Sequence, residues 1–292
     1  MALNPVVFKT RALTALVFIL VMACGLFIDQ WSFFLLFTFI HFGCWFEYQK
    51  LVGIIDTDYK QIMGIHKYGV MLFGWGFMMW MTNDAYHIGD LQLSEIGWWV
   101  MLILAFTMPV AEIVLSRHLN LKNIGYSLCG LVYISLCWGL MMDLRSEGIL
   151  IFGNLFTLDL GWVLPVVIIA AIWINDTMAY MVGSVIGKTP FSSISPKKTW
   201  EGTLGGAILA IATVALLGYF AFGMTDYITL IVISVTAALA GTAGDLFESK
   251  LKRMAGVKDS GNIMPGHGGF LDRFDSLLFT TPIVWLYVKL FL

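Results

Sequence analysis

The hydrophobic positions of this chain gather into long runs that short polar segments separate. A helix that spans a bilayer needs roughly 20 apolar residues, within a range of about 17–25. Helices are expected because a helix satisfies its own backbone polar groups in lipid. The runs predict an all-α polytopic membrane protein with nine spans: residues 11–28, 31–50, 66–82, 96–115, 124–142, 162–186, 202–223, 227–248 and 276–292.

Composition supports this class. Hydrophobic residues make up 59% of the chain and charged residues 12%, whereas soluble domains are about 45–50% apolar and about 25% charged. The four cysteines lie inside apolar runs without a C-x-x-C pair, so we interpret them as packing residues. Lys9 and Arg11 before the first run also fit a signal peptide, but further runs follow from Trp31, which favours a first membrane span.

The positive charges predict the topology. With nine spans, the N-terminal tail and the loops after spans 2, 4, 6 and 8 lie on one side of the membrane. All of the 17 Lys and Arg residues except Arg145 and Lys289 fall on the side of the N-terminal tail. The positive-inside rule therefore predicts a cytoplasmic N-terminus in a multi-pass protein of the cell inner (cytoplasmic) membrane.

Ionisable residues divide the chain unevenly. The expected organisation is one integral membrane domain with an N-terminal scaffold half, 1–150, and a C-terminal catalytic half, 151–292. Within the scaffold half, Glu47 and Glu112 fit a functional or a structural role equally well.

The sixth predicted span carries the first candidate group. Asp176 and Tyr180 are four residues apart and share a helix face, which Gly183 and Gly187 continue. Such glycines permit close packing or the close approach of a ligand. Asp176 also fits a structural hydrogen bond between helices, but carboxylates within a membrane are usually functional. We expect Asp176 to bind substrate.

The loop after this span has the character of a phosphate-binding segment. It holds Lys188, Ser195, Lys197 and Lys198 just before the next helix, whose free N–H groups favour anions. Lysine adds point charges for phosphate oxygens. The spacing is not that of a P-loop. An ordinary cytoplasmic loop is the alternative, and the density of lysine and hydroxyl residues favours phosphate binding.

The most charged stretch runs from Gly244 to Ser276, between two apolar segments. Asp245, Asp272 and Asp275 are hard oxygen ligands that suit Mg²⁺ together with substrate phosphates. The expected phosphate-binding residues are Lys250, Lys252, Arg253, Lys258 and Arg273. Carboxylates beside bases and glycines predict metal-assisted phosphoryl or nucleotidyl transfer.

Three residues of this stretch fit two roles each. His267 has either a direct role or a hydrogen bond that caps the loop. Asp259 and Glu248 fit ion pairs with neighbouring bases as well as a place in the site.

The same residues resemble the signature of the phosphatidate cytidylyltransferases, or CDP-diacylglycerol synthases. Residues 249–253 read S-K-L-K-R, 258–261 read K-D-S-G, and 265–275 read P-G-H-G-G-F-L-D-R-F-D. The run S-P-K-K-T-W-E-G at 195–202 and the Asn175-Asp176 pair also resemble the family. The likeness is strong over about 170–280, whereas the first 150 residues match in hydropathy alone.

This resemblance implies a reaction in which CTP and phosphatidate give CDP-diacylglycerol and pyrophosphate, with Mg²⁺ as cofactor and a homodimer as the assembly. It carries Asp245 and Asp272 over as metal ligands. The expected catalytic residues are Asp245, Asp272, Lys252, Arg253 and His267. The expected substrate-binding residues are Asp176, Lys188, Ser195, Lys197, Lys198, Lys258, Asp259, Arg273 and Asp275.

Two other functions compete with this hypothesis. An ion-coupled transporter would use Asp176 and Asp245 as ion sites, but it predicts repeated halves that the sequence lacks. A lipid kinase, or a CTP-dependent transferase for another lipid, would share the charged loops. The complete signature at 265–275 favours the cytidylyltransferase.

Overall fold

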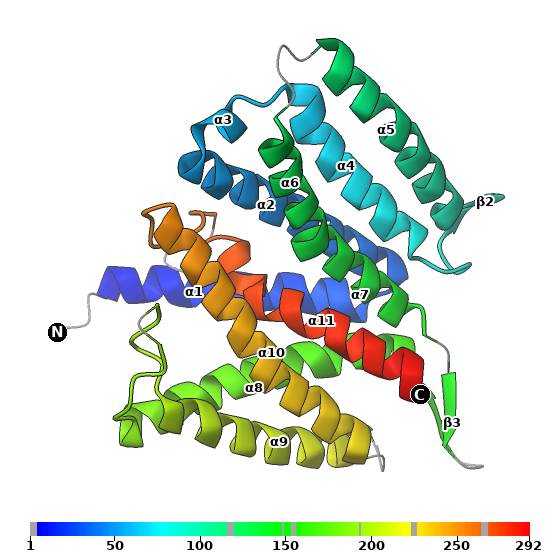
Figure 1. The fold of residues 1–292 in the computed structure, drawn as a ribbon. Helices are drawn as coiled ribbons and strands as arrows, with labels where there is room; N and C mark the ends of the chain where they lie inside the picture. Colours follow the sequence, from blue (N-terminus) through cyan, green and yellow to red (C-terminus); the bar gives the residue numbers. More distant parts are fainter. Residues whose placement is uncertain are drawn as a thin grey trace. The chain divides into compact units, whose positions relative to one another are not determined.

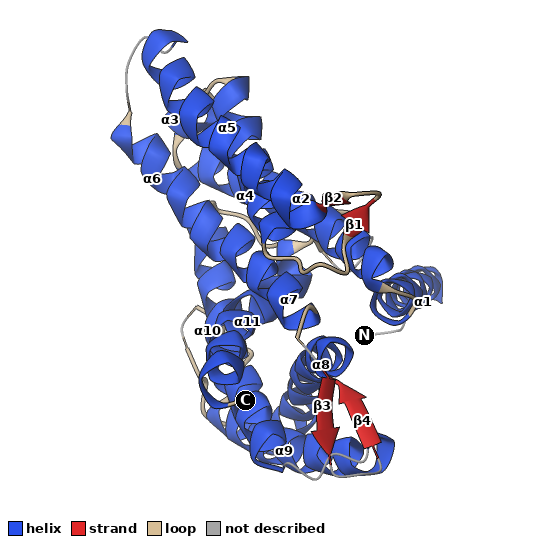
Figure 2. Ribbon diagram, turned by 90° about the vertical axis from the view of Figure 1, so that its right-hand side faces the viewer, coloured by secondary structure: helices blue, strands red, loops and turns tan. Residues whose placement is uncertain are grey.

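The computed structural model describes residues 5–115, 120–147, 149–152, 156–192, 194–222, 227–263 and 268–292. In this part the chain is almost entirely helical, which confirms the predicted all-α class (Figures 1 and 2). Two short antiparallel hairpins interrupt the helices: β1 (His87–Ile88) pairs with β2 (Leu91–Gln92), and β3 (Ile149–Phe152) pairs with β4 (Phe156–Asp159). The apolar runs had predicted neither hairpin.

The chain divides into two compact units. Unit 1 comprises Met1–Gly148 and Met254–Arg273, and unit 2 comprises Ile149–Arg253 and Phe274–Leu292. The charged stretch near the C-terminus therefore contributes to both units. The division at residue 150 into a scaffold half and a catalytic half stays a prediction.

Unit 1 is built mainly from helices of the N-terminal part of the chain. Figure 1 shows α4 and α5 side by side, and they share an extensive contact. The elements are α1 (Pro5–Phe27), α2 (Gln30–Ile55), α3 (Thr57–Lys60), α4 (Gly64–Trp80), α5 (Leu93–Leu115), α6 (Leu121–Gly130), the π-helical turn η1 (Leu131–Leu136) and α7 (Cys137–Arg145).

Unit 2 contains a closely packed pair of helices, α8 (Leu160–Ile186) and α9 (Trp200–Phe222), which lie side by side in Figure 1. The unit also holds α10 (Tyr227–Met254) except for its last residue, Met254, which belongs to unit 1. The final helix, α11 (Leu271–Phe291), begins in unit 1 and continues into unit 2. The predicted eighth span ended at residue 248, but α10 continues to Met254, so Lys250, Lys252 and Arg253 lie on its last turns.

Six helical segments among the described residues are long and apolar enough to cross a membrane. They are Leu93–Leu115, Leu121–Arg145, Gly161–Ile186, Trp200–Phe220, Tyr227–Met254 and Leu271–Phe291. The first three predicted spans coincide with α1, α2 and α4, which do not meet that criterion over their described residues. The count of nine spans and the orientation of the N-terminus stay predictions.

The core of unit 1 forms around α2. Asp29 caps this helix, since its carboxylate accepts a hydrogen bond from Ser32 N at 2.7 Å. One face is then buried along the helix, including Trp45, which is fully enclosed. Trp45 Nε1 donates to Ser135 Oγ at 2.9 Å, and His41 Nε2 lies 3.0 Å from the same oxygen. These polar contacts link α2 to the π-helical turn, as expected for helices packed in lipid.

Candidate functional site

Three carboxylates come together in unit 2. Asp245 and Glu248 are one turn apart on α10, and Asp275 lies on α11. Each offers an oxygen within 4.8 Å of the oxygens of the other two. The helices approach closely here because Gly244 has no side chain: a Cβ at this position would overlap the Asp275 carbonyl. The sequence had grouped Asp245 with Asp272 and Asp275 and had left Glu248 as a doubtful member.

Two lysines balance this acidic cluster of Asp245, Glu248 and Asp275. Lys198 forms an ion pair with Asp245, and Lys252 forms one with Glu248 four residues earlier on the same helix. Glu248 is fully buried, so an unpaired charge there would be costly. The cluster and its two lysines thus include Lys198, Asp245, Lys252 and Asp275, four residues that the sequence had singled out. Asp176, on α8, is exposed.

The basic loop between α8 and α9, residues 187–199, is held in a defined shape. Phe191 N donates to Lys198 O at 2.7 Å, and Trp200 N donates to Thr189 O at 3.0 Å. The rings of Phe191 and Trp200 pack at a centroid distance of 4.4 Å. These contacts fold the loop back on itself and bring Lys198 to Asp245.

Glu201 on the first turn of α9 fixes the base of this loop. Its carboxylate accepts hydrogen bonds from Lys188 N at 3.2 Å, from Thr189 N at 3.1 Å and from Thr189 Oγ1 at 2.7 Å. Glu201 was not among the site residues predicted from the sequence. Its place in the first turn of a helix after a basic loop was the available signal.

The other predicted residues of the basic loop remain near solvent. Lys188 and Lys197 are exposed, and Ser195 is half-buried. Close packing of the two flanking helices, which glycines on the predicted sixth span had indicated, is confirmed. A Cβ on Gly202 of α9 would lie 2.8 Å from Ala179 O on α8.

The described signature residues from Lys258 to Arg273 belong to unit 1. Lys258, Asp259 and Arg273 are exposed there. Asp272 Oδ2 accepts hydrogen bonds from Ser260 N at 2.9 Å and from Gly269 N at 2.8 Å, and it lies 2.8 Å from Ser260 Oγ. Arg253 is exposed at the end of α10 in unit 2. His267 lies outside the described residues, so its role stays a prediction.

The residues of the acidic cluster fit a divalent cation. Carboxylate oxygens are the ligands that Mg²⁺ prefers, and this ion commonly takes one or two carboxylates while keeping several waters. Asp245, Glu248 and Asp275 supply such oxygens within reach of one ion. Asp272, the second ligand predicted from the sequence, is described in unit 1, and its pairing with Asp245 stays a prediction.

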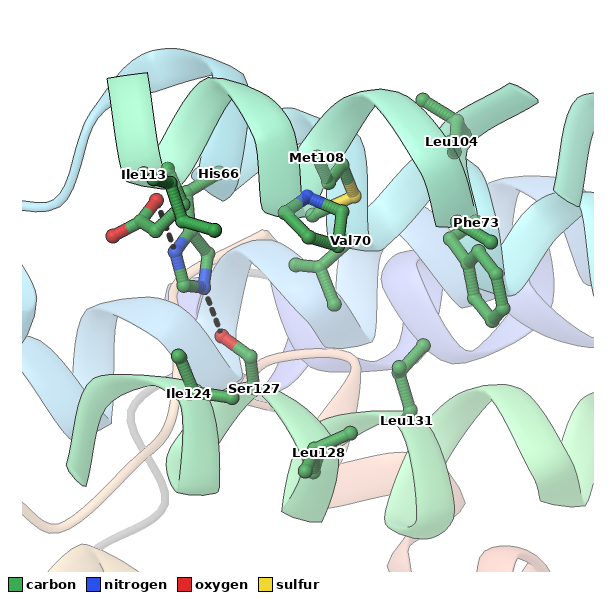
Figure 3. Close-up of a pocket in the computed structure, with 13 residues that line it drawn as sticks. His66, Val70, Phe73, Leu104, Met108, Ile113, Ile124, Ser127, Leu128 and Leu131 are labelled. Atoms are coloured by element: carbon green, nitrogen blue, oxygen red, sulfur yellow. Dashed lines mark hydrogen bonds and ion pairs between the residues drawn. The ribbon is translucent and has the colours of Figure 1, made fainter. Parts of the chain in front are cut away.

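A second polar group lies beside a cavity of about 400 Å³ in unit 1, between α4, α5 and the α6–η1 segment (Figure 3). His66 Nδ1 lies 3.1 Å from Glu112 Oε2, and His66 Nε2 lies 2.8 Å from Ser127 Oγ. The order serine, histidine, carboxylate is that of a hydrolase triad. Ser127, however, lies inside helix α6, where backbone N–H groups bond within the helix and cannot form an oxyanion hole. We therefore interpret this group as a link between three helices.

Comparisons with known proteins agree with the family that the sequence resembles. A sequence profile of the cytidylyltransferase family matches residues 9–291. Phosphatidate cytidylyltransferase of Bacillus subtilis is 33% identical over 223 residues, which cover 76% of this chain and 77% of that protein. The Staphylococcus saprophyticus enzyme of the same name is 30% identical over 284 residues, covering 94% and 97%. A chloroplastic relative from Arabidopsis thaliana, phosphatidate cytidylyltransferase 4, is 33% identical over 198 residues, covering 63% and 51%. The chain therefore belongs to the cytidylyltransferase family.

Proposed function

We propose that this protein transfers a cytidylyl group from CTP to phosphatidate. A phosphate oxygen of phosphatidate forms a bond to the α-phosphorus of CTP. The bond from that phosphorus to the oxygen bridging the α- and β-phosphates breaks, and pyrophosphate leaves. CDP-diacylglycerol remains in the membrane. We expect positioning and electrostatics to supply most of the rate, without a covalent enzyme intermediate.

The observation that carries the proposal is the family match over nearly the whole chain, together with relatives named for this activity. The site supports it independently. A cytidylyl transfer joins two phosphate-bearing substrates, so it needs cations close to anionic oxygens. Unit 2 places Lys198 and Lys252 directly on the acidic cluster, and the exposed Lys188 and Lys197 lie on the adjoining loop.

We further propose that Mg²⁺ binds at the acidic cluster, held by Asp245 with Asp275 and Glu248, and by Asp272 as the sequence predicts. When bound, the ion would polarise the CTP phosphates and neutralise charge that develops on the leaving pyrophosphate. The protein's own contribution is to orient these carboxylates. Lys198 pairs with Asp245, and Lys252 pairs with Glu248, so these two carboxylates are held beside cationic groups that would bind phosphate.

The orientation and assembly belong to the same proposal. The positive-inside distribution favours a cytoplasmic active site, where CTP is available, in a multi-pass protein of the cytoplasmic membrane. The resemblance to the family favours a homodimer. A single cysteine at the exposed Asn262, in a chain without the four native cysteines, should react with an impermeant maleimide only from the cytoplasmic side. Labelling from the opposite side would refute this orientation.

The activity is tested with purified protein, radiolabelled CTP, phosphatidate and Mg²⁺. The wild type should form CDP-diacylglycerol, and Asp245→Asn should lower kcat/KM by roughly 100-fold or more because it removes charge where cations act. Asp90→Asn is the matched control, since Asp90 is an exposed carboxylate beside the β1–β2 hairpin. A wild type that forms no CDP-lipid would overturn the proposed function, and an undiminished Asp245→Asn would overturn the assigned site.

A further inference from the structure

A carboxylate from the second helix contacts the signature loop more than 200 residues later in the chain. This loop joins α10 to α11, and the structure describes its residues 255–263 and 268–270. Glu47 on α2 is 8% exposed. Its Oε1 accepts a hydrogen bond from Phe270 N at 2.9 Å. Its Oε2 accepts from Leu271 N at 2.9 Å and from Ser260 Oγ at 2.7 Å. All of these residues belong to unit 1.

The two backbone donors lie at the start of α11, which begins at Leu271. The first N–H groups of a helix have no partner within it, and they carry the positive end of the helix dipole. A buried carboxylate aimed at these groups satisfies them and is stabilised in return. Glu47 therefore acts as an N-terminal cap for α11, although it comes from a different helix.

The loop itself is shaped to receive this carboxylate. A Cβ built on Gly261 or on Gly269 would overlap the carboxylate of Glu47. On the other side of the contact, a Cβ on Gly43 would overlap the ring of Phe270. Glycines on both surfaces thus let the loop lie directly against α2, with Glu47 between its two ends.

Ser260 connects this contact to Asp272. Its hydroxyl lies 2.7 Å from Glu47 Oε2 and 2.8 Å from Asp272 Oδ2. Asp272 Oδ2 also accepts from the backbone N–H groups of Ser260 and Gly269. Glu47 and Asp272 therefore hold the loop from opposite sides of one serine, and a shift of either carboxylate displaces the donors of the other.

We propose that Glu47 is a positioning residue for the cytidylyl transfer, acting through Ser260 and the Gly269–Leu271 backbone to fix Asp272 and Arg273. The inference rests on the proposed function. It assigns a role in the reaction to the N-terminal half of the chain, which the sequence had marked as a scaffold. Glu47 itself need not touch either substrate.

The test compares Glu47→Gln with Glu95→Gln, a control at an exposed glutamate on the first turn of α5. Glutamine keeps the shape of the side chain but turns one acceptor oxygen into a donor, so at least one loop donor faces an N–H group. We expect kcat/KM to fall by roughly 10- to 100-fold in Glu47→Gln, as for small misplacements of reacting groups, and to stay unchanged in Glu95→Gln.

Hydrogen exchange supplies a readout that does not depend on activity. In Glu47→Gln the amides of Phe270 and Leu271 should exchange faster, while those in the middle of α2 keep wild-type protection. Faster exchange with unchanged kcat/KM would show a structural contact without a role in the reaction, and unchanged exchange would refute the contact itself. If the wild type proves inactive, the exchange result still judges the contact, so the two failures are distinguishable.

A double-mutant cycle distinguishes loss of this contact from a general loss of folding. Gly269→Ala adds a methyl group that overlaps the Glu47 carboxylate. In the Glu47→Ala background that overlap is gone, so Gly269→Ala should lower kcat/KM by a smaller factor than it does in the wild type. Equal factors in both backgrounds would show that the two residues act independently and would overturn the proposal.

Discussion

Two loops that carry signature residues are each held by a glutamate, but in different ways. In unit 2, Glu201 holds the basic loop through Lys188 and Thr189, 12 or 13 residues earlier, and these hydrogen bonds are exposed. In unit 1, Glu47 holds the start of α11 through donors 213 to 224 residues later, in a largely buried contact. The first contact joins residues close in the sequence and is exposed to water, whereas the second joins residues far apart in the sequence and is shielded from water.

The difference decides what each carboxylate contributes. Donors that water can reach are solvated when their acceptor is removed, so an exposed contact mainly narrows the range of loop conformations. Donors shielded from water keep a desolvation penalty when they lose their acceptor. Glu47 should therefore matter for both stability and activity, and Glu201 mainly for activity.

The largest effect, and the sharpest test of the difference between the two glutamates, is expected from Glu47→Leu. The apolar side chain leaves the N–H groups of Phe270 and Leu271 facing hydrocarbon, while the Ser260 hydroxyl keeps Asp272 as a partner. We therefore expect a loss of about 2–5 kcal/mol in the free energy of unfolding. Unfolding in mixed detergent micelles measures it. A loss below about 1 kcal/mol would mean that water reaches the loop and that the contact resembles the one at Glu201.

Glu201→Ala should have an intermediate effect. Lys188 N and Thr189 N then bond to water, so the protein stays folded while the basic loop samples more conformations. We expect kcat/KM to fall by roughly three- to tenfold, mainly through a higher KM for CTP, because Lys198 and the neighbouring lysines are less well placed. Steady-state kinetics with varied CTP checks it. A large drop in thermal stability instead would show that the local contact supports the fold.

The smallest effect is expected at a third carboxylate, Asp56, which caps α3 and forms an ion pair with Lys122 at 2.6 Å. The hydrogen bond with Lys122 lowers the pKa of Asp56 below its usual 3.8. A lowered pKa stabilises the folded state above the unfolded-state pKa, and this contribution disappears as the pH falls through the folded-state pKa. Asp56→Asn should therefore lower the thermal midpoint slightly at pH 7, and the difference should disappear once the pH falls below the lowered pKa of Asp56.

The local features were the predictable ones. Runs of apolar residues predicted where helices form, because a 20-residue run shows its length and character directly. The lysines of the basic loop and the carboxylates of α10 and α11 were recognisable from residue type and spacing. The fold then brought Lys198 to Asp245, which no spacing could show, although both residues had been selected.

What escaped prediction depended on contacts between distant segments. Glu47 is one carboxylate in an apolar run, and nothing near it in the sequence names Ser260 or Phe270 as its partners. The hairpin at His87–Gln92 has strands of two residues, too short for any periodicity, and turns at Gly89 with φ of 63°. Ser135 meets His41 and Trp45 from a π-helical turn, and the sequence of that turn, L-V-Y-I-S-L, did not predict it.

The contact between Glu47 and Ser260 also has a consequence for the order in which the protein is made. The two residues are 213 positions apart. At about 5–20 residues per second, Ser260 follows Glu47 by roughly 10 to 40 seconds of synthesis. During that interval α2 carries a carboxylate whose final partners do not yet exist. The nascent chain must keep this carboxylate solvated until the loop arrives, so the loop docks late in biogenesis.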